Sequence, residues 1–223
     1  MVDIQTPAGS IPAHAELLGA GMPGVVILPS IYGADSGTIA LIDSFAKAGI
    51  SAVIPDLFWR TKPGAVDFDQ RREAMDRANA LRPRIALSDT LAVLDWMRMR
   101  CQGLPAIIGI CFGGQYAVMA AARNVVSAAM TWHGGGLLQL VELSGLPRCP
   151  LSMHFGESDR LIPLSDVARL RNTFGRNANV AIHLHPDCGH GFTHRGHANF
   201  APFAANAAMA DARRLILDGI KRK

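Results

Sequence analysis

The sequence predicts an α/β fold in which helices cover both faces of a mostly parallel central sheet. Short apolar runs alternate along the chain with longer segments of helical spacing, which is the pattern of repeated βαβ units. The chain has 223 residues, a length that suits one α/β domain, and we expect a single domain over 1–223. Hydrophobic residues make up 49% of the chain and charged residues 18%, so there are enough apolar side chains for a sizeable core.

The strands are predicted where short apolar runs are followed by residues typical of turns. The run 25–28 ends at Pro29, and the run 51–54 ends at Pro55 and Asp56. Continuous apolar runs of this kind are typical of strands that are buried on both faces. Further strands are predicted at 106–110, 127–131, 151–155 and 180–184.

The helices are predicted from apolar residues that recur at helical spacing between these runs. The first spans 38–48, and Gly49 is placed to end it. Residues 70–100 are predicted as two helices because Pro83 cannot continue the first of them. The remaining helices are predicted at 113–122, 164–174 and 201–220.

The charge and hydropathy patterns argue against nucleic-acid and membrane partners. The formal net charge is +4, but the basic residues are scattered and form no binding face. No run approaches the roughly 18 apolar residues that span a membrane, and residues 1–20 lack the apolar stretch of a signal peptide. We therefore expect a soluble, cytoplasmic protein. The four cysteines form no C-x-x-C pair, so free thiols are expected.

The strongest functional signal is Gly-Ile-Cys-Phe-Gly-Gly at 109–114, between a predicted strand and a predicted helix. It matches the G-x-nucleophile-x-G pattern of the nucleophile elbow, with Cys111 in place of the usual serine. The turn is so sharp that side chains two residues before and after the nucleophile would collide, which explains Gly109 and Gly113. At a helix N-terminus, the dipole and free N–H groups favour a thiolate and can bind an oxyanion.

Two later loops supply candidates for the other members of a catalytic triad. Asp159 follows the strand predicted at 151–155, and His190 follows the strand predicted at 180–184. Nucleophile, acid and base then occur in the chain order of α/β-hydrolases. In that scheme His190 transfers protons, and Asp159 fixes the tautomer of His190 and stabilises its imidazolium form.

These segments resemble the dienelactone hydrolase family over nearly the whole chain. The likeness rests on the cysteine elbow, and it continues in the segments Ile-Tyr-Gly at 31–33, Pro-Asp-Leu-Phe at 55–58, Gly-Glu-Ser-Asp at 156–159 and Gly-His-Gly-Phe at 189–192. The resemblance implies an α/β-hydrolase fold and a carboxymethylenebutenolidase-like activity on a small ester or lactone. It also implies that no metal or organic cofactor is needed.

The same resemblance implies roles for individual residues. Cys111 would be the nucleophile, and the backbone N–H groups of Phe112 and Ile31 would form the oxyanion hole. Family members hold a substrate carboxylate with arginines, and Arg71, Arg72 and Arg195 lie near the matching places, which favours an anionic substrate.

Two further strand-end segments are predicted to lie at the substrate site. Ser30 stands where family members carry a glutamate that helps to deprotonate the cysteine. A serine hydroxyl is not a base near neutral pH. Either His190 forms an ion pair with Cys111 in the free enzyme, or acylation is slow and rises with pH up to the thiol pKa, or another carboxylate replaces the glutamate, Asp35 being the nearest along the chain. Trp132, together with the His-Gly-Gly-Gly segment at 133–136, is predicted to line the floor of the pocket.

Two other functions remain open on the sequence. Histidines crowd the stretch 183–197, and His183 and His185 lie two apart on a predicted strand, so they face the same way. A zinc-dependent hydrolase is therefore one alternative, although the stretch has no H-E-x-x-H or zinc-finger spacing. The other is a non-catalytic protein that uses Cys111 as a redox-sensitive thiol, or uses the fold as a binding module.

Overall fold

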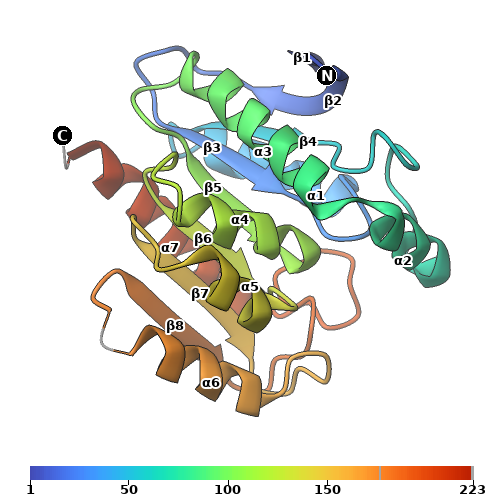
Figure 1. The fold of residues 1–223 in the computed structure, drawn as a ribbon, viewed down its shortest axis with the longest axis vertical. Helices are drawn as coiled ribbons and strands as arrows, with labels where there is room; N and C mark the ends of the chain where they lie inside the picture. Colours follow the sequence, from blue (N-terminus) through green and yellow to red (C-terminus); the bar gives the residue numbers. More distant parts are fainter. Residues whose placement is uncertain (176, 222–223) are drawn as a thin grey trace.

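The computed structural model describes residues 1–175 and 177–221, and one eight-stranded sheet runs through them (Figure 1). Its strands lie in the order β1-β2-β4-β3-β5-β6-β7-β8. Neighbouring strands from β4 to β8 are parallel, whereas β1 pairs with β2, and β2 with β4, in antiparallel register. The strands are β1 (Val2–Thr6), β2 (Gly9–Glu16), β3 (Gly24–Leu28), β4 (Ser51–Pro55), β5 (Ala106–Ile110), β6 (Ala129–Trp132), β7 (Leu151–Gly156) and β8 (Val180–His185).

The helices form two layers, one on each face of this sheet (Figure 1). The α1 and α7 helices pack against one face, and α3, α4, α5 and α6 pack against the other. Val26 and Leu28 of β3 face the α3–α6 layer, and Val25 and Ile27 face the α1–α7 layer, which explains why this strand reads as a continuous apolar run. The helices are α1 (Ser36–Ala46), α2 (Arg71–Ala80), α3 (Pro83–Arg98), α4 (Gly114–Ala121), α5 (Leu137–Ser144), α6 (Leu164–Phe174) and α7 (Pro202–Lys221).

The predicted α/β architecture is confirmed, with shifts of a few residues at the ends of elements. Pro83 lies in the first turn of α3, where its missing N–H is tolerated, so the predicted break between α2 and α3 occurs there. The α1 helix begins earlier than predicted because the Asp35 side chain accepts a hydrogen bond of 2.9 Å from the Thr38 N–H and caps it. None of the helices in the described part of the chain has the length and hydropathy needed to cross a membrane.

Three elements, β1, β2 and α5, lie outside the sequence predictions. In β1, Ile4 faces the core while Asp3 and Gln5 are exposed, so the strand contains no apolar run. The α5 helix begins directly after the glycines of the His-Gly-Gly-Gly segment, and Gly136, with a φ of +68°, makes the turn into it. A glycine cluster indicates a loop, which hides the short helix that follows.

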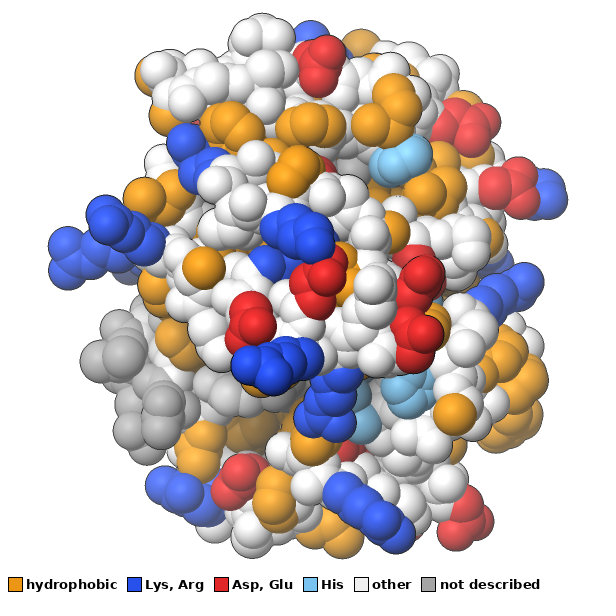
Figure 2. Space-filling view, turned by 90° about the vertical axis from the view of Figure 1, so that its right-hand side faces the viewer, with side chains coloured by type: hydrophobic (Ala, Val, Ile, Leu, Met, Phe, Trp, Pro, Cys, Tyr) orange, Lys and Arg blue, Asp and Glu red, His pale blue; other side chains and the backbone are white. Residues whose placement is uncertain are grey.

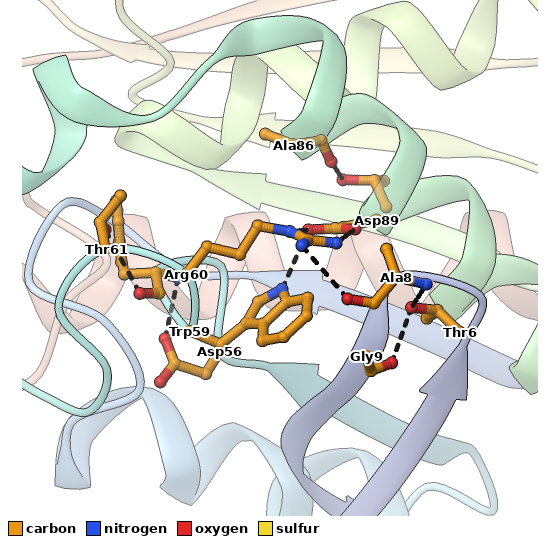
Figure 3. Close-up of polar contacts among 11 residues, drawn as sticks. Thr6, Ala8, Gly9, Asp56, Trp59, Arg60, Thr61, Ala86 and Asp89 are labelled. Atoms are coloured by element: carbon orange, nitrogen blue, oxygen red, sulfur yellow. Dashed lines mark hydrogen bonds and ion pairs between the residues drawn. The ribbon is translucent and has the colours of Figure 1, made fainter.

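A buried carboxylate ties the loop after β4 to α3 (Figure 3). Asp89 of α3 accepts three hydrogen bonds of 2.9 Å, from Trp59 Nε1, Arg60 Nε and Arg60 Nη2. The Arg60 guanidinium also lies over the Trp59 ring, 3.9 Å from its centroid. This network fixes the path of the chain from β4 toward α2.

Asp89→Ala is expected to lower the free energy of unfolding by about 2 kcal/mol, because the Trp59 N–H and the Arg60 guanidinium lose their acceptor. Arg60 remains partly exposed, which keeps the loss below that of a fully buried ion pair. Urea denaturation measures the change. Asp95→Ala, on the exposed side of the same helix, is the matched control and is expected to change the free energy by less than about 0.5 kcal/mol. Equal losses in the two variants would contradict the role of Asp89.

Candidate active site

Cys111 stands at the end of β5, where the 3-10 turn η1 (Cys111–Gly113) leads into α4. Its φ of +51° is a strained, left-handed value for a residue other than glycine. A Cβ atom at Gly109 would collide with the Gly113 carbonyl oxygen, and a Cβ atom at Gly113 would lie 2.5 Å from the Leu28 carbonyl oxygen. The steric prediction of glycine at 109 and 113 is therefore confirmed.

The side chains of Cys111, His190 and Asp159 form one hydrogen-bonded series. The Cys111 Sγ lies 3.1 Å from His190 Nε2, and His190 Nδ1 lies 2.8 Å from Asp159 Oδ2. The Asp159 side chain is fully buried, whereas His190 keeps some exposure and Cys111 is half-buried. The sulfur therefore lies at the accessible end of the series and the carboxylate at the enclosed end.

Backbone and side-chain contacts hold the last two members of this series in place. Asp159 Oδ1 accepts hydrogen bonds from the N–H groups of Leu161, at 2.8 Å, and Ile162, at 3.2 Å, which leaves Oδ2 for His190. The carbonyl oxygen of His190 accepts a hydrogen bond of 2.8 Å from Asn199 Nδ2. Asn199 is a positioning residue that the sequence patterns do not indicate, because an asparagine in a loop carries no motif of its own.

The pKa values of the two neighbouring histidines are shifted in opposite directions. Burial alone would lower the pKa of His190, but its hydrogen bonds to Asp159 and Cys111 outweigh burial and raise the pKa to about 10. Burial, together with the nearby His190, holds the pKa of His133 well below its usual range. The His133 ring lies 4.9 Å from the His190 ring, and its Nε2 lies 2.9 Å from Thr193 Oγ1. A neutral His133 places no second positive charge beside the imidazolium of His190.

Arg77 of α2 organises the loop after β3, which carries Ile31. Its guanidinium donates to the Ile31 carbonyl oxygen from Nε, at 2.9 Å, and from Nη2, at 2.6 Å. Its Nη1 donates to the carbonyl oxygens of Lys62, at 3.1 Å, and Gly64, at 2.7 Å. No sequence pattern indicates the role of Arg77, because these contacts join segments that lie far apart along the chain. The buried arginine thus fixes the loop in which one predicted oxyanion-hole donor lies.

Ser30 and Asp35 have structural contacts in the turn that follows β3. The buried Ser30 hydroxyl accepts a hydrogen bond of 3.2 Å from the Tyr32 N–H. Asp35 caps α1, and its Oδ1 lies 3.0 Å from His194 Nε2. Asp35 is therefore held by α1 and His194, and these contacts do not support it as the replacement for the family glutamate.

The three arginines predicted at the substrate site occupy different positions. The pKa of the Tyr32 hydroxyl is raised, mainly by burial. The charge of Arg71 opposes this shift and the charge of Cys111 adds to it, so both groups lie close enough to Tyr32 to affect its pKa. Arg72 lines a surface groove of about 580 Å³ beside α2. Arg195 is exposed in the loop after β8. Of the three arginines, Arg71 is the one whose charge acts on Tyr32, a residue on which the Cys111 charge also acts.

Trp132 and His133 lie in different surroundings, although they are adjacent in sequence. Trp132 is buried in the core between the sheet and the α1–α7 layer, so the prediction that it lines the pocket is not supported. Successive side chains at the end of a strand point in different directions, and His133 instead lies against His190. His133 has a φ of +41°, which is a strained, left-handed value for a residue other than glycine. Gly136 also has a positive φ, which a glycine adopts without strain.

The histidines of the stretch 183–197 separate into several groups in the fold. His183 and His185 lie against His154 of β7, His190 contacts Cys111, and His194 contacts Asp35. The stretch therefore does not supply one shared metal centre. Among the described residues, two groups bring three metal-binding side chains within 4.8 Å of one another, and these are Cys111–His133–His190 and His154–His183–Asp211.

Comparison with known proteins decides the family. The model of the dienelactone hydrolase family matches residues 13–221. The chain belongs to the dienelactone hydrolase family. It is 34% identical to a carboxymethylenebutenolidase-like protein of Azospirillum brasilense, over 93% of this chain and 94% of that protein. It is 28% identical to the carboxymethylenebutenolidase of Pseudomonas sp. (strain P51), over 91% of this chain and 87% of that enzyme.

Solved structures agree with the fold of this dienelactone hydrolase family member. A dienelactone hydrolase-like protein of Klebsiella pneumoniae superposes with a TM-score of 0.84 at 20% identity, covering 96% of each chain. A metagenomic dienelactone hydrolase-like promiscuous phosphotriesterase gives a TM-score of 0.80 at 19% identity, covering 97% of this chain and 96% of its own. At these identities the similarity shows the α/β-hydrolase fold, while the family match and the sequence relatives identify the chain as an ester or lactone hydrolase.

Proposed function

We propose that this family member hydrolyses a small ester or lactone through an acyl-enzyme on Cys111, with His190 as acid and base and Asp159 as the group that orients it. The observation that carries the proposal is the pair of contacts Cys111 Sγ–His190 Nε2, 3.1 Å, and His190 Nδ1–Asp159 Oδ2, 2.8 Å. A nucleophile, a base within hydrogen-bond reach and a third group that orients the base are the parts that covalent catalysis needs.

In the first half of the proposed reaction, the Cys111 thiolate attacks the acyl carbon and the carbonyl oxygen becomes an oxyanion. The N–H groups of Phe112 and Ile31 are proposed to bind that oxyanion. The carbon–oxygen bond of the ester then breaks, and the leaving oxygen takes the proton from His190 Nε2. A thioester on Cys111 and a neutral His190 remain.

In the second half, neutral His190 removes a proton from a water molecule as its oxygen attacks the thioester carbon. The carbon–sulfur bond breaks, the acid product leaves, and the thiolate and the imidazolium are restored. Asp159 stays ionised throughout and stabilises each cationic form of His190. With a lactone, the leaving alcohol stays attached to the acyl group until this second half is complete.

Trapping the acyl-enzyme tests the proposal. After brief mixing with an activated acetate ester, intact-mass and peptide mass spectrometry are expected to show one acetyl group on Cys111. In His190→Gln, where the base for deacylation is missing, the proportion acylated at long times is expected to rise after slower acylation. Absence of an adduct on Cys111 in both proteins, while wild type turns the ester over, would refute the covalent route.

The position of Arg71 near Tyr32 supports an anionic substrate. Arg71 acts on the same Tyr32 hydroxyl as Cys111 does. Figure 2 shows the side of the molecule on which α2 lies in Figure 1, and acidic and basic side chains are interspersed there. No uniformly basic surface is visible in that view, so recognition of an anion is expected to depend on a local arginine contact.

Arg71→Met is expected to raise KM about tenfold for an ester that carries a carboxylate, because a charge-assisted contact is lost. KM for a matched neutral ester is expected to stay unchanged. Arg72→Met is the control, since Arg72 is adjacent in sequence but lines the separate groove beside α2. Steady-state kinetics with both esters provide the measurement. An equal effect of Arg71→Met on the two esters, or an equal effect of the two variants, would count against the anionic substrate.

A further inference from the structure

A second cluster of metal-binding side chains lies outside the proposed active site, where α7 packs on β7. His154 of β7 pairs in register with His183 of β8, so the two side chains project from the same face of the sheet. Their rings stack with centroids 4.5 Å apart. Asp211 of α7 reaches the same point, and its Oδ2 lies 3.2 Å from His154 Nε2 and 4.0 Å from His183 Nε2.

The surrounding residues hold two of these side chains in a metal-binding orientation. His154 Nε2 lies 3.2 Å from Asp211 Oδ2, to which it can donate its N–H, and His154 Nδ1 lies 3.0 Å from His185 Nε2. An ion would take the place of the Nε2 proton, while the proton on Nδ1 is shared with His185. Arg214 Nη2 donates a hydrogen bond of 2.6 Å to Asp211 Oδ1, which leaves Oδ2 directed at the histidines. Ser152 Oγ donates to that Oδ2 at 2.6 Å. Partners of this kind orient the ligands in metal sites.

His183 provides an independent observation. Its Nε2 is shielded from solvent and has no hydrogen-bond partner among the described residues. A buried polar nitrogen without a partner is uncommon, because it loses its hydrogen bond to water and gains nothing in return. The His183 side chain as a whole is 43% exposed, so rotation of its ring can turn this nitrogen toward an ion that enters from solvent.

We propose that His154 Nε2, His183 Nε2 and Asp211 Oδ2 bind a Zn²⁺ ion, with water as the fourth ligand. Two imidazoles and a carboxylate are ordinary zinc ligands, and the three ligand atoms lie within 4.8 Å of one another. Zinc–ligand bonds of about 2.1 Å in a tetrahedral shell place the ligand atoms about 3.4 Å apart. The His154–Asp211 separation of 3.2 Å meets this spacing, and rotation of the partly exposed His183 ring shortens the separation of 4.0 Å.

An ion at this position joins three elements at one edge of the fold. It links β7 and α7 to β8, which is the edge strand of the sheet and leads into the loop that carries His190. Binding to the folded state alone stabilises it by mass action. We therefore assign the ion a stabilising role at this edge of the sheet, although its shell keeps one water. The site is separate from Cys111 and does not depend on the proposed reaction.

Thermal unfolding in the presence of Zn²⁺ tests this site. The full-length Cys111→Ala protein is used beside wild type, because Cys111, His133 and His190 form the other group that could bind the ion. At zinc concentrations about a hundred times Kd, Tm is expected to rise by about 5 °C in both proteins. In His183→Gln and Asp211→Asn the Kd from equilibrium dialysis is expected to rise tenfold or more, so the Tm shift at the same zinc concentration is expected to fall to about half or less. His14→Gln, on β2 far along the sheet from β8, is the matched histidine control and is expected to keep the shift.

A second measurement avoids any dependence on the folding of the variants. Co²⁺ bound to unsubstituted protein is expected to give the visible absorption of a four-coordinate ion, and Zn²⁺ is expected to displace it, in Cys111→Ala as in wild type. Absence of both the absorption and the Tm shift would overturn the site, as would equal zinc affinity in His183→Gln, Asp211→Asn and His14→Gln. Removal of the ion by a chelator is expected to lower Tm and leave ester hydrolysis unchanged, and loss of hydrolysis would overturn the assignment of a purely structural ion.

Discussion

Cys111→Ala is expected to lower kcat/KM for ester hydrolysis by about 10⁴-fold to 10⁶-fold while leaving the fold intact. The substitution removes the sulfur that is proposed to form the covalent bond and that lies 3.1 Å from His190 Nε2. The turn itself does not depend on the sulfur, because glycine at 109 and 113 supplies the space that the elbow needs. Activity that remains would come from the oxyanion hole and substrate binding.

Cys149→Ala provides the matched control for this variant. Cys149 lies in the core, where burial raises the pKa of its thiol to about 12, so it stays protonated and unreactive. Its replacement is expected to reduce stability slightly and to leave kcat/KM within about twofold of wild type, since it touches nothing in the site. The measurement is kcat/KM of both variants and wild type for an activated ester. Circular dichroism checks that each variant is folded. If Cys111→Ala kept more than a tenth of wild-type activity, another nucleophile would be responsible.

The triad candidates can be predicted from the sequence because each one follows a strand that is recognisable as a short run of apolar residues. The apolar runs that precede Cys111, Asp159 and His190 are the strands β5, β7 and β8, and parallel strands bring their C-terminal ends to one edge of the sheet. The glycines of the elbow add a steric requirement that can be read directly from residue type. The structure then supplies what spacing alone does not, namely the distances that join the three side chains.

Contacts between distant segments could not be predicted in this way. Arg77 meets the Ile31 carbonyl across 46 positions, and His154 meets Asp211 across 57. No periodicity encodes such pairs, because they depend on how α2 and α7 are placed over the sheet. His183 and His190 are near one another along the chain, but in the fold they lie among different neighbours. The residue types show that Arg77 can donate hydrogen bonds and that His154 and Asp211 can bind a metal. Their partners follow only from the way in which α2 and α7 pack in the fold.

The sequence leaves open how the cysteine is activated, and the structure favours the ion pair with His190. Ser30 occupies the place of the family glutamate and holds a turn, and Asp35 is engaged with His194. His190 is the ionisable group in direct contact with the Cys111 sulfur, and the hydrogen bonds that oppose the effect of burial raise its pKa to about 10. An imidazolium that persists to such pH values can stabilise a thiolate without the help of a second carboxylate.

The rate of Cys111 alkylation by iodoacetamide is therefore expected to stay nearly constant from about pH 9 down to pH 6 in wild type. The sign follows from the raised pKa of His190, since the imidazolium is present below that pKa and is lost only as pH rises through about 10. In His190→Gln the ion pair is absent, so the rate is expected to fall as it does for a free thiol, with a pKa of about 8.5, and to be more than a hundredfold lower at pH 6 than at its plateau. Cys111→Ser measures the background from the three buried thiols, Cys101, Cys149 and Cys188. A wild-type profile that fell as steeply as that of His190→Gln would show that the free enzyme holds a neutral pair, and that His190 must remove the thiol proton during attack on the substrate.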